Sequence, residues 1–164
     1  MLPKRKSTAI PHYDYSQPGA YFITLCVEKR RPILGKIDSS PQVVLSSIGK
    51  IVSDVWYSLP QRFPCLDAIS QSIFVVVPDH IHGILQITAG GGGGPPPSPT
   101  LHQILGSFKS ITTIETNRLL GTPGQKLWQR SAYEHILRNQ QDFDEAAGYI
   151  AENPARRLER EEFE

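Results

Sequence analysis

Hydrophobic and polar positions alternate in some segments of the chain and recur every three or four residues in others, which separates strands from helices. The segment 20–28 alternates, with apolar or aromatic residues on both faces, and is predicted to be a strand covered on both sides. An apolar stripe at helical spacing in 43–59 predicts a helix that ends at Pro60, and a second stripe predicts a helix over 101–120. The remaining elements are a hairpin, with strands in 72–79 and 80–87, and a short strand at 134–137.

This order of strand, helix, strand, strand, helix and strand predicts an α+β, ferredoxin-like fold. Both helices are expected on one face of an antiparallel sheet. A further helix is predicted from Asn139 to Asn153, because Asn139 can cap it, acidic residues fill its first turns and Pro154 is expected to end it. We expect this C-terminal helix near the other face of the sheet, which the first two helices leave available.

The chain is predicted to form one domain over 1–164, because its 164 residues, of which 39% are hydrophobic, suffice for one core but not two. The run of glycines and prolines at 89–99 cannot form a packed structure and is read as a flexible surface loop within that domain. Cys26 and Cys65 lie in apolar surroundings and are interpreted as buried thiols rather than a disulfide or a structural zinc site.

Charge and targeting signals restrict the location and the partners. No apolar run approaches membrane-spanning length, and no hydrophobic signal core follows the basic N-terminus, so we expect a cytoplasmic, nucleoid-associated protein without a membrane partner. The net charge of +1 is low for a protein that coats nucleic acid, and it favours recognition of a defined structure such as a hairpin. The candidate phosphate contacts are the basic clusters 4–6, 29–31 and 156–157, although such clusters are more often plain solvated surface.

Two histidines carry the first candidate chemistry. His80 and His82 follow a Pro78-Asp79 turn and open the second strand of the hairpin. Side chains two residues apart on a strand point to the same side of the sheet, which suits two ligands of one metal ion. We expect that ion on an open, solvent-reachable sheet face. The alternative is two half-buried strand histidines that are hydrogen-bonded to their neighbours.

A tyrosine in the C-terminal helix is the second candidate for the chemistry. Tyr149 lies at the edge of the apolar stripe, with Glu152 at i+3 and Asn153 at i+4 on the same side of the helix. The alternative is a tyrosine that packs its ring at the stripe and leaves its hydroxyl in water. Gly148 directly before it costs the helix about 1 kcal/mol relative to alanine, so it either permits close packing or marks a hinge.

Two stretches, 78–83 (PDHIHG) and 149–154 (YIAENP), together resemble the single-tyrosine HUH transposases, most closely the REP-associated tyrosine transposases. The resemblance extends over nearly the whole chain, through 21–24 (YFIT), 107–110 (SFKS) and 128–135 (WQRSAYEH). It implies a metal-dependent endonuclease and strand transferase, a transposase, that acts on hairpin-forming single-stranded DNA through a 5′-phosphotyrosine intermediate. The alternative is a domesticated, non-mobile relative that retains the fold and binds hairpin DNA.

By position, the resemblance assigns Mg²⁺ or Mn²⁺ binding to His80, His82 and Asn153, and attack on a DNA phosphate to Tyr149. Imidazole also suits Zn²⁺ or Ni²⁺, so the identity of the metal rests on the resemblance. Asn153 is a neutral, weak ligand, and Glu152 or an ordered water could replace it.

The DNA contacts expected from the sequence are Lys109, Arg130 and an N-terminal arm of Lys4, Arg5 and Lys6. A plain solvated lysine is the alternative for Lys109. The sequence leaves open whether the protein acts as a monomer or a homodimer, which DNA sequence it binds and whether it is mobile.

Other aromatic residues and other classes of protein compete with this interpretation. Tyr133 is the main rival nucleophile, but it precedes a strand, has no polar partner at i+4 and is expected to pack. Trp128 is expected to lie in the core rather than to stack on a base. A two-histidine phosphoesterase would need a second His-x-Ser/Thr strand, and an RNA-binding module would need an exposed aromatic strand; the sequence has neither pattern.

Overall fold

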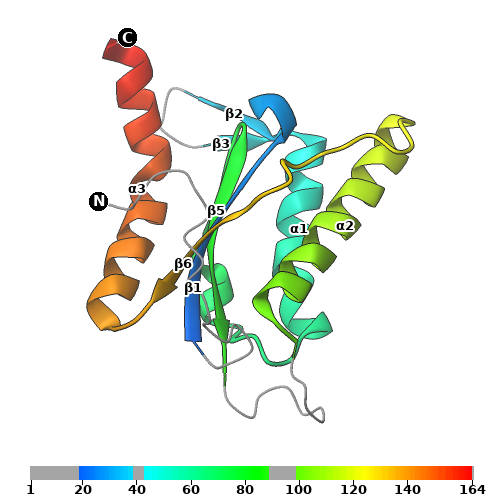
Figure 1. Cartoon of the computed structure of the whole chain (residues 1–164). Helices are drawn as coiled ribbons and strands as arrows, with labels where there is room; N and C mark the ends of the chain where they lie inside the picture. The colour runs from blue at the N-terminus through cyan, green and yellow to red at the C-terminus, as the bar shows by residue number, and fades with distance from the viewer. Residues whose placement is uncertain (1–18, 39–42, 89–98, 164) are drawn as a thin grey trace.

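A computed structural model describes residues 19–38, 43–88 and 99–163 of the chain, with side chains up to Glu152 (Figure 1). Its main sheet has four antiparallel strands in the order β4-β5-β1-β6, so β5 and β1 are central. These strands are β1 (Gly19–Cys26), β4 (Phe74–Val77), β5 (His80–Ile87) and β6 (Tyr133–Leu137). A separate two-stranded sheet, which the sequence did not predict, consists of β2 (Gly35–Ile37) and β3 (Val43–Leu45).

Helices cover both faces of the main sheet. α1 (Ser47–Arg62) and α2 (Leu101–Leu120) pack side by side on one face, and α3 (Gln140–Phe163) lies across the other (Figure 1). The larger hydrophobic core lies between the sheet and the α1–α2 pair, and a smaller one lies under α3. This arrangement confirms the predicted ferredoxin-like fold, with two helices on one face and the C-terminal helix on the other.

Strand β1 joins the two cores. Tyr21, Ile23 and Leu25 point into the larger core, whereas Phe22 points into the smaller one, and all four side chains are almost completely buried. The prediction of a strand covered on both faces is therefore confirmed. A short 3-10 helix, η1 (Glu28–Arg30), follows β1, and another, η2 (Ser70–Ser72), precedes β4.

The helix predicted over 43–59 begins later than the pattern indicates. Residues Val43–Leu45 pair with β2 as a strand instead, and the Ser46 side chain caps α1 by accepting a hydrogen bond from the Gly49 N–H at 3.0 Å. A short apolar run fits a strand as well as a helix, and for this reason the predicted helix wrongly included residues 43–45.

The same helix also continues past Pro60, which was expected to end it. Proline lacks the N–H that would bond to the carbonyl four residues earlier, here that of Trp56. The Gln71 side-chain Nε2 donates to this Trp56 carbonyl at 2.8 Å. A residue from η2 thus replaces the missing backbone donor, and the helix runs on to Arg62.

Helix α2 has the predicted bounds, but the apolar stripe predicted to face the core is wrong toward its C-terminal end. Ile114 and Leu119 are 52% and 53% exposed, while Thr112 and Thr116 are buried. The Thr112 hydroxyl donates to a backbone carbonyl of its own helix and accepts a hydrogen bond from Trp128 Nε1 at 2.8 Å. That contact, together with burial, confirms Trp128 as a core residue.

The start of α3 is confirmed and its end is not. Asn139 Oδ1 accepts a hydrogen bond from the Asp142 N–H at 2.8 Å, which is the predicted cap. The helix extends to Phe163, so Pro154 does not end it. The residues after Pro154 are mostly alanine, leucine, arginine and glutamate, whose high helix propensities favour continuation.

The predicted Gly/Pro loop at 89–99 lies outside the described residues except for Pro99. Within the described ranges, none of the helices has the length and apolar character needed to cross a membrane.

Candidate active site

The histidine pair lies on β5, in the middle of the main sheet. In register on β1, Thr24 faces His82 and Cys26 faces His80. Both imidazoles lie on the sheet face that α3 covers, which confirms that they point to one side. The prediction of an open surface is wrong, because the exposed fractions are 9% for His80 and 5% for His82. Helix α3 and the aromatic residues beneath it close this face.

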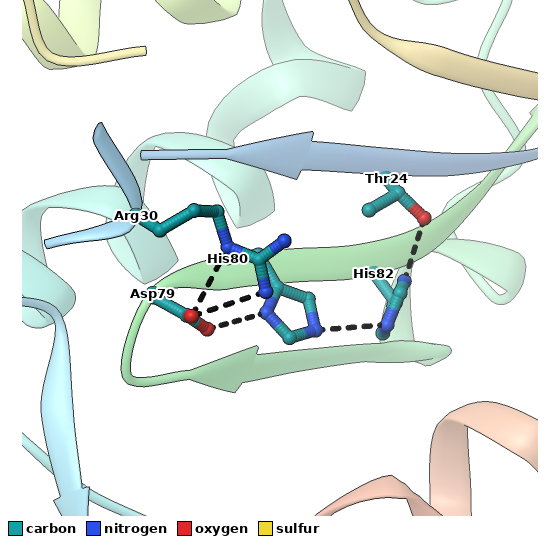
Figure 2. A network of polar contacts seen from close by, with 5 residues as sticks. All are labelled: Thr24, Arg30, Asp79, His80 and His82. Atoms are coloured by element: carbon teal, nitrogen blue, oxygen red, sulfur yellow. Dashed lines mark hydrogen bonds and ion pairs between the residues drawn. The ribbon is translucent and has the colours of Figure 1, made fainter. Parts of the chain in front are cut away.

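A chain of polar contacts fixes both rings (Figure 2). His80 Nδ1 lies 2.7 Å from Asp79 Oδ1, and His82 Nδ1 lies 2.7 Å from Thr24 Oγ1. The two Nε2 atoms face each other at 3.1 Å. Each ring is thus held through Nδ1 and directs Nε2 to a common point, as metal-binding histidines do when a second partner orients them.

The protonation state of His82 and the orientation of His80 are suited to binding a metal ion. Burial lowers the pKa of His82 well below its usual value, and the positive charges of His80 and Arg30 lower it further, so this ring is neutral at neutral pH. The Asp79 carboxylate can only accept, so His80 donates from Nδ1. The two Nε2 atoms lie within hydrogen-bond distance, with the donor set by the tautomers, and a cation could bind between them where both carry a lone pair.

The spacing of the two nitrogens fits one ion. Imidazole nitrogens bind divalent metals at about 2.1 Å. Two such nitrogens about 90° apart, as in the octahedral sites that Mg²⁺ prefers, would lie about 3.0 Å from each other. The observed 3.1 Å is close to this value, and it is also the distance of a direct hydrogen bond between the two rings.

Besides the two histidines, a bound metal ion would need ligands other than His, Cys, Asp or Glu side chains of the described residues. In the described part of the chain, no group of three or more His, Cys, Asp or Glu side chains could hold a metal. Asp79 is adjacent, but its carboxylate oxygens bind His80 and Arg30. The Asn153 side chain lies outside the described side chains, and Glu152 is exposed on α3. A metal ion held by the two histidines would need an amide, water or substrate oxygens to complete its coordination.

Tyr149 lies beside the histidine pair, as expected. Its ring centroid is 5.3 Å from that of His82, in an edge-on arrangement, and 5.9 Å from that of Phe22. Phe22 in turn stacks on His82 at 5.3 Å. The structure therefore brings Tyr149, His80 and His82 together from α3 and β5.

The neighbours of Tyr149 along α3 were also singled out in the sequence. Asn153 lies one turn further along the helix backbone. Gly148 is exposed, and a Cβ atom built on it would meet no other atom within 4 Å. Close packing therefore does not explain this glycine.

Tyr133 remains close to the site. It lies on β6 directly opposite Thr24 of β1, and its ring packs edge-on against Phe22 at 5.9 Å. The rival tyrosine thus packs, as expected, but on the same sheet face as the histidines. The two tyrosines differ in their contacts, since the Tyr149 ring packs against His82 and the Tyr133 ring against Phe22.

Lys109 is not brought together with the histidines, because it lies on α2, which covers the opposite face of the sheet (Figure 1). Its Nζ donates to the carbonyls of Gln129 and Arg130 at 2.9 and 3.0 Å. Burial and the nearby Lys126 lower the pKa of Lys109. These contacts tie α2 to the segment before β6.

The other predicted DNA contacts are Arg130 and the N-terminal arm, and the structure describes only the first of them. The Arg130 side chain is exposed, and Lys4, Arg5 and Lys6 lie outside the described residues.

Two members of the polar network were missed in the sequence. Thr24 reaches His82 only through the register of β1 on β5, for which the sequence has no local signal. Arg30 binds Asp79 through Nε at 3.1 Å and through a second nitrogen at 3.0 Å. The basic cluster at 29–31 was the one available hint, but it did not indicate which residue faces the site.

The chain has a relative of similar sequence among known proteins. No protein-family model matches it. A protein of Haemophilus influenzae, described as uncharacterized, is 30% identical over an alignment of 164 positions that covers 92% of this chain and 88% of that protein.

Two solved structures have a similar fold. A REP-associated tyrosine transposase bound to a REP hairpin has a TM-score of 0.60 and 18% identity, and the match covers 96% of this chain and 74% of that one. A Deinococcus radiodurans protein provisionally assigned as a transposase has a TM-score of 0.51 and 13% identity, with 91% and 96% covered. At these identities the likeness shows the fold.

Proposed function

The chain belongs to one family with the Haemophilus influenzae protein and has the fold of the REP-associated tyrosine transposases, and from this premise we propose that it is a transposase. Its proposed reaction is cleavage and rejoining of single-stranded DNA. Its proposed substrate is hairpin-forming DNA, because the solved transposase of this fold is bound to a REP hairpin. The observation that supports the proposal best is the meeting of Tyr149 with His80 and His82 on one sheet face.

In this proposal, His80 and His82 hold a Mg²⁺ or Mn²⁺ ion through their Nε2 atoms, and the Asn153 amide is the third protein ligand. A bound divalent ion would neutralise negative charge on the scissile phosphate and favour departure of the 3′ oxygen. Thr24 and Asp79 keep the rings in the orientation that binding requires.

Tyr149 is the proposed nucleophile. A phenol with a pKa near ~10 is a weak nucleophile at neutral pH, so its position next to the phosphate has to supply most of the rate. Helix α3 delivers the Tyr149 ring against His82, and Phe22 supports both rings from below. One rigid helix thus carries the nucleophile to the histidine strand.

The step balances without a further reactant. A bond forms between Tyr149 Oη and phosphorus, and the bond between phosphorus and the 3′ oxygen breaks. The phenol proton passes to water, and the departing oxygen takes up a proton to become a free 3′-OH. The 5′-phosphotyrosine retains the energy of the broken bond, so a 3′-OH of another strand can reverse the step without a nucleotide cofactor.

A labelled foldback oligonucleotide tests the proposal. The 5′-phosphate side of the cut stays on the protein, so with Mn²⁺ a 3′-end label should move with the protein on a denaturing gel, whereas a 5′-end label should be released. Tyr149→Phe should abolish the adduct, and the matched Tyr133→Phe variant should retain it. Tight hairpin binding by the wild type without any adduct would instead favour the domesticated DNA-binding protein.

A further inference from the structure

Arg30 has an unusual backbone conformation next to the proposed site. Its φ is 52°, and that of Lys29 is 60°, so two consecutive residues other than glycine lie in the left-handed region. Side chains on Cβ disfavour this conformation, and it occurs mainly where surrounding contacts enforce it, often at functional sites. The bend therefore directs attention to what Arg30 contacts.

Backbone hydrogen bonds fold the bend onto the β4–β5 turn. The Arg30 N–H donates to the Val27 carbonyl, and the Val27 N–H donates to the Asp79 carbonyl, both at 2.9 Å. The chain is thus anchored at the turn that precedes His80. This anchoring brings the Arg30 side chain over the Asp79 carboxylate and next to His80 (Figure 2).

One carboxylate links the arginine to the histidines. Asp79 Oδ2 accepts a hydrogen bond from Arg30 Nε at 3.1 Å and forms an ion pair with Nη2 at 3.0 Å, and Asp79 Oδ1 binds His80 Nδ1. Arg30 is therefore tied to His80 through a single carboxylate.

The guanidinium still has donors to offer. An arginine carries five N–H donors, and the described contacts with Asp79 use Nε and Nη2. Among the described residues, Nη1 has no hydrogen-bond acceptor, and in Figure 2 this nitrogen carries no dashed line. The Arg30 side chain is 50% exposed, so a ligand can reach it from solvent.

The charges indicate what that ligand is. The charges of Asp79 and Arg30 cancel in their ion pair, so a divalent ion bound by the histidines would leave the cluster with a net positive charge. An anion with oxygen acceptors would balance it. The phosphodiester that the proposed function brings to Tyr149 has this chemistry, and planar guanidinium donors match phosphate oxygens well.

We propose that Arg30 binds a non-bridging oxygen of the scissile phosphate, beside the metal held by His80 and His82. This inference rests on the proposed function and adds a substrate-binding residue to it. Asp79 then serves two groups, since one oxygen orients His80 and the other holds the arginine in place.

The first test separates phosphate binding from indirect support of His80. Arg30→Gln should slow adduct formation by about a hundredfold or more, as the loss of one transition-state donor does in other enzymes. Its Mn²⁺ affinity, measured by calorimetry, should stay within about twofold of the wild type, since Asp79 and both histidines remain. The matched control is Lys50→Gln, which removes a positive charge from the exposed surface of α1, on the opposite face of the sheet, and should leave the rate within about threefold.

The second test removes the charge from the DNA instead. In the Tyr149→Phe background, which binds but does not cut, a methylphosphonate at the scissile position should weaken binding when Arg30 is present. It should have little further effect in Arg30→Gln, because the two changes remove the same contact.

The outcomes distinguish the two proposals. If Arg30→Gln forms the adduct at the wild-type rate, or loses Mn²⁺ affinity in step with activity, Arg30 does not bind the phosphate, and the proposed function stands. Equal methylphosphonate effects with and without Arg30 would also overturn the inference. If the wild type forms no adduct, both proposals fall.

Discussion

Gly83 directly follows His82, and the structure predicts that replacing it, even by alanine, destabilises the protein. Its backbone packs against the indole of Trp56 on the α1 side of the sheet, and an added Cβ would lie 2.6 Å from Trp56 Cη2 and 3.2 Å from Phe74 Cδ1. Carbon atoms without a bond prefer separations of about 3.5–4.0 Å, so something must shift.

Trp56 has little freedom to make room. The side chain is completely buried, its Nε1 donates to the Gln71 carbonyl at 2.9 Å, and its ring stacks on Phe74 with centroids 4.6 Å apart. Overpacking of this kind typically costs about 1–3 kcal/mol. For a protein of this size, each kcal/mol lowers the melting temperature by about 2–4 °C, so Gly83→Ala should melt roughly 2–12 °C below the wild type.

Thermal unfolding followed by circular dichroism measures this change, and Gly106→Ala is the matched control. A Cβ atom on Gly106, in α2, would meet no other atom within 4 Å, so that variant should be as stable as the wild type or more so. Because a displaced β5 also moves His82, Gly83→Ala should bind Mn²⁺ more weakly as well. A melting temperature for Gly83→Ala equal to or above the wild type would refute the packing argument.

Three further predictions follow from other parts of the structure. His80→Ala should abolish the single Mn²⁺ site seen by calorimetric titration, and unchanged binding would exclude the histidine pair as ligands. Gly148→Ala should stabilise α3 by up to about 1 kcal/mol, because the new methyl group meets open space; a lower melting temperature would contradict this. Gln71→Leu leaves the Trp56 carbonyl unpaired and should destabilise by about 1–3 kcal/mol in urea unfolding, whereas wild-type stability would show that Pro60 needs no such donor.

Local rules predicted those parts of the site that lie within one element. The Pro78-Asp79 turn sets the start of β5, and strand alternation then puts His80 and His82 on one face. Likewise, Asn139 marks the start of α3 through a contact only three residues long. The same-side histidines and the tyrosine helix could therefore be predicted, as could the order of strands and helices along the chain.

Contacts between distant segments could not be predicted in this way. Pro60 would end the helix by its own chemistry, but Gln71 supplies the donor that it lacks. Thr24 meets His82 only after two strands pair, and the Arg30 bend has no signature in the residue types. The burial of the histidines likewise depends on where α3 packs on the sheet. The sequence does not specify this position, and therefore it predicted a solvent-exposed site.

The identity of the residue bonded to DNA tests the central claim most directly. After reaction with a foldback oligonucleotide and Mn²⁺, nuclease and trypsin digestion would separate the two tyrosines that lie at the site, since Tyr149 falls in the peptide 139–156 and Tyr133 in the peptide 131–138. Each of these peptides contains a single tyrosine. Mass spectrometry should find the nucleotide-phosphate mass on 139–156 and only the unmodified form of 131–138. A modification on 131–138, or on neither peptide, would contradict the assignment of Tyr149 as the nucleophile.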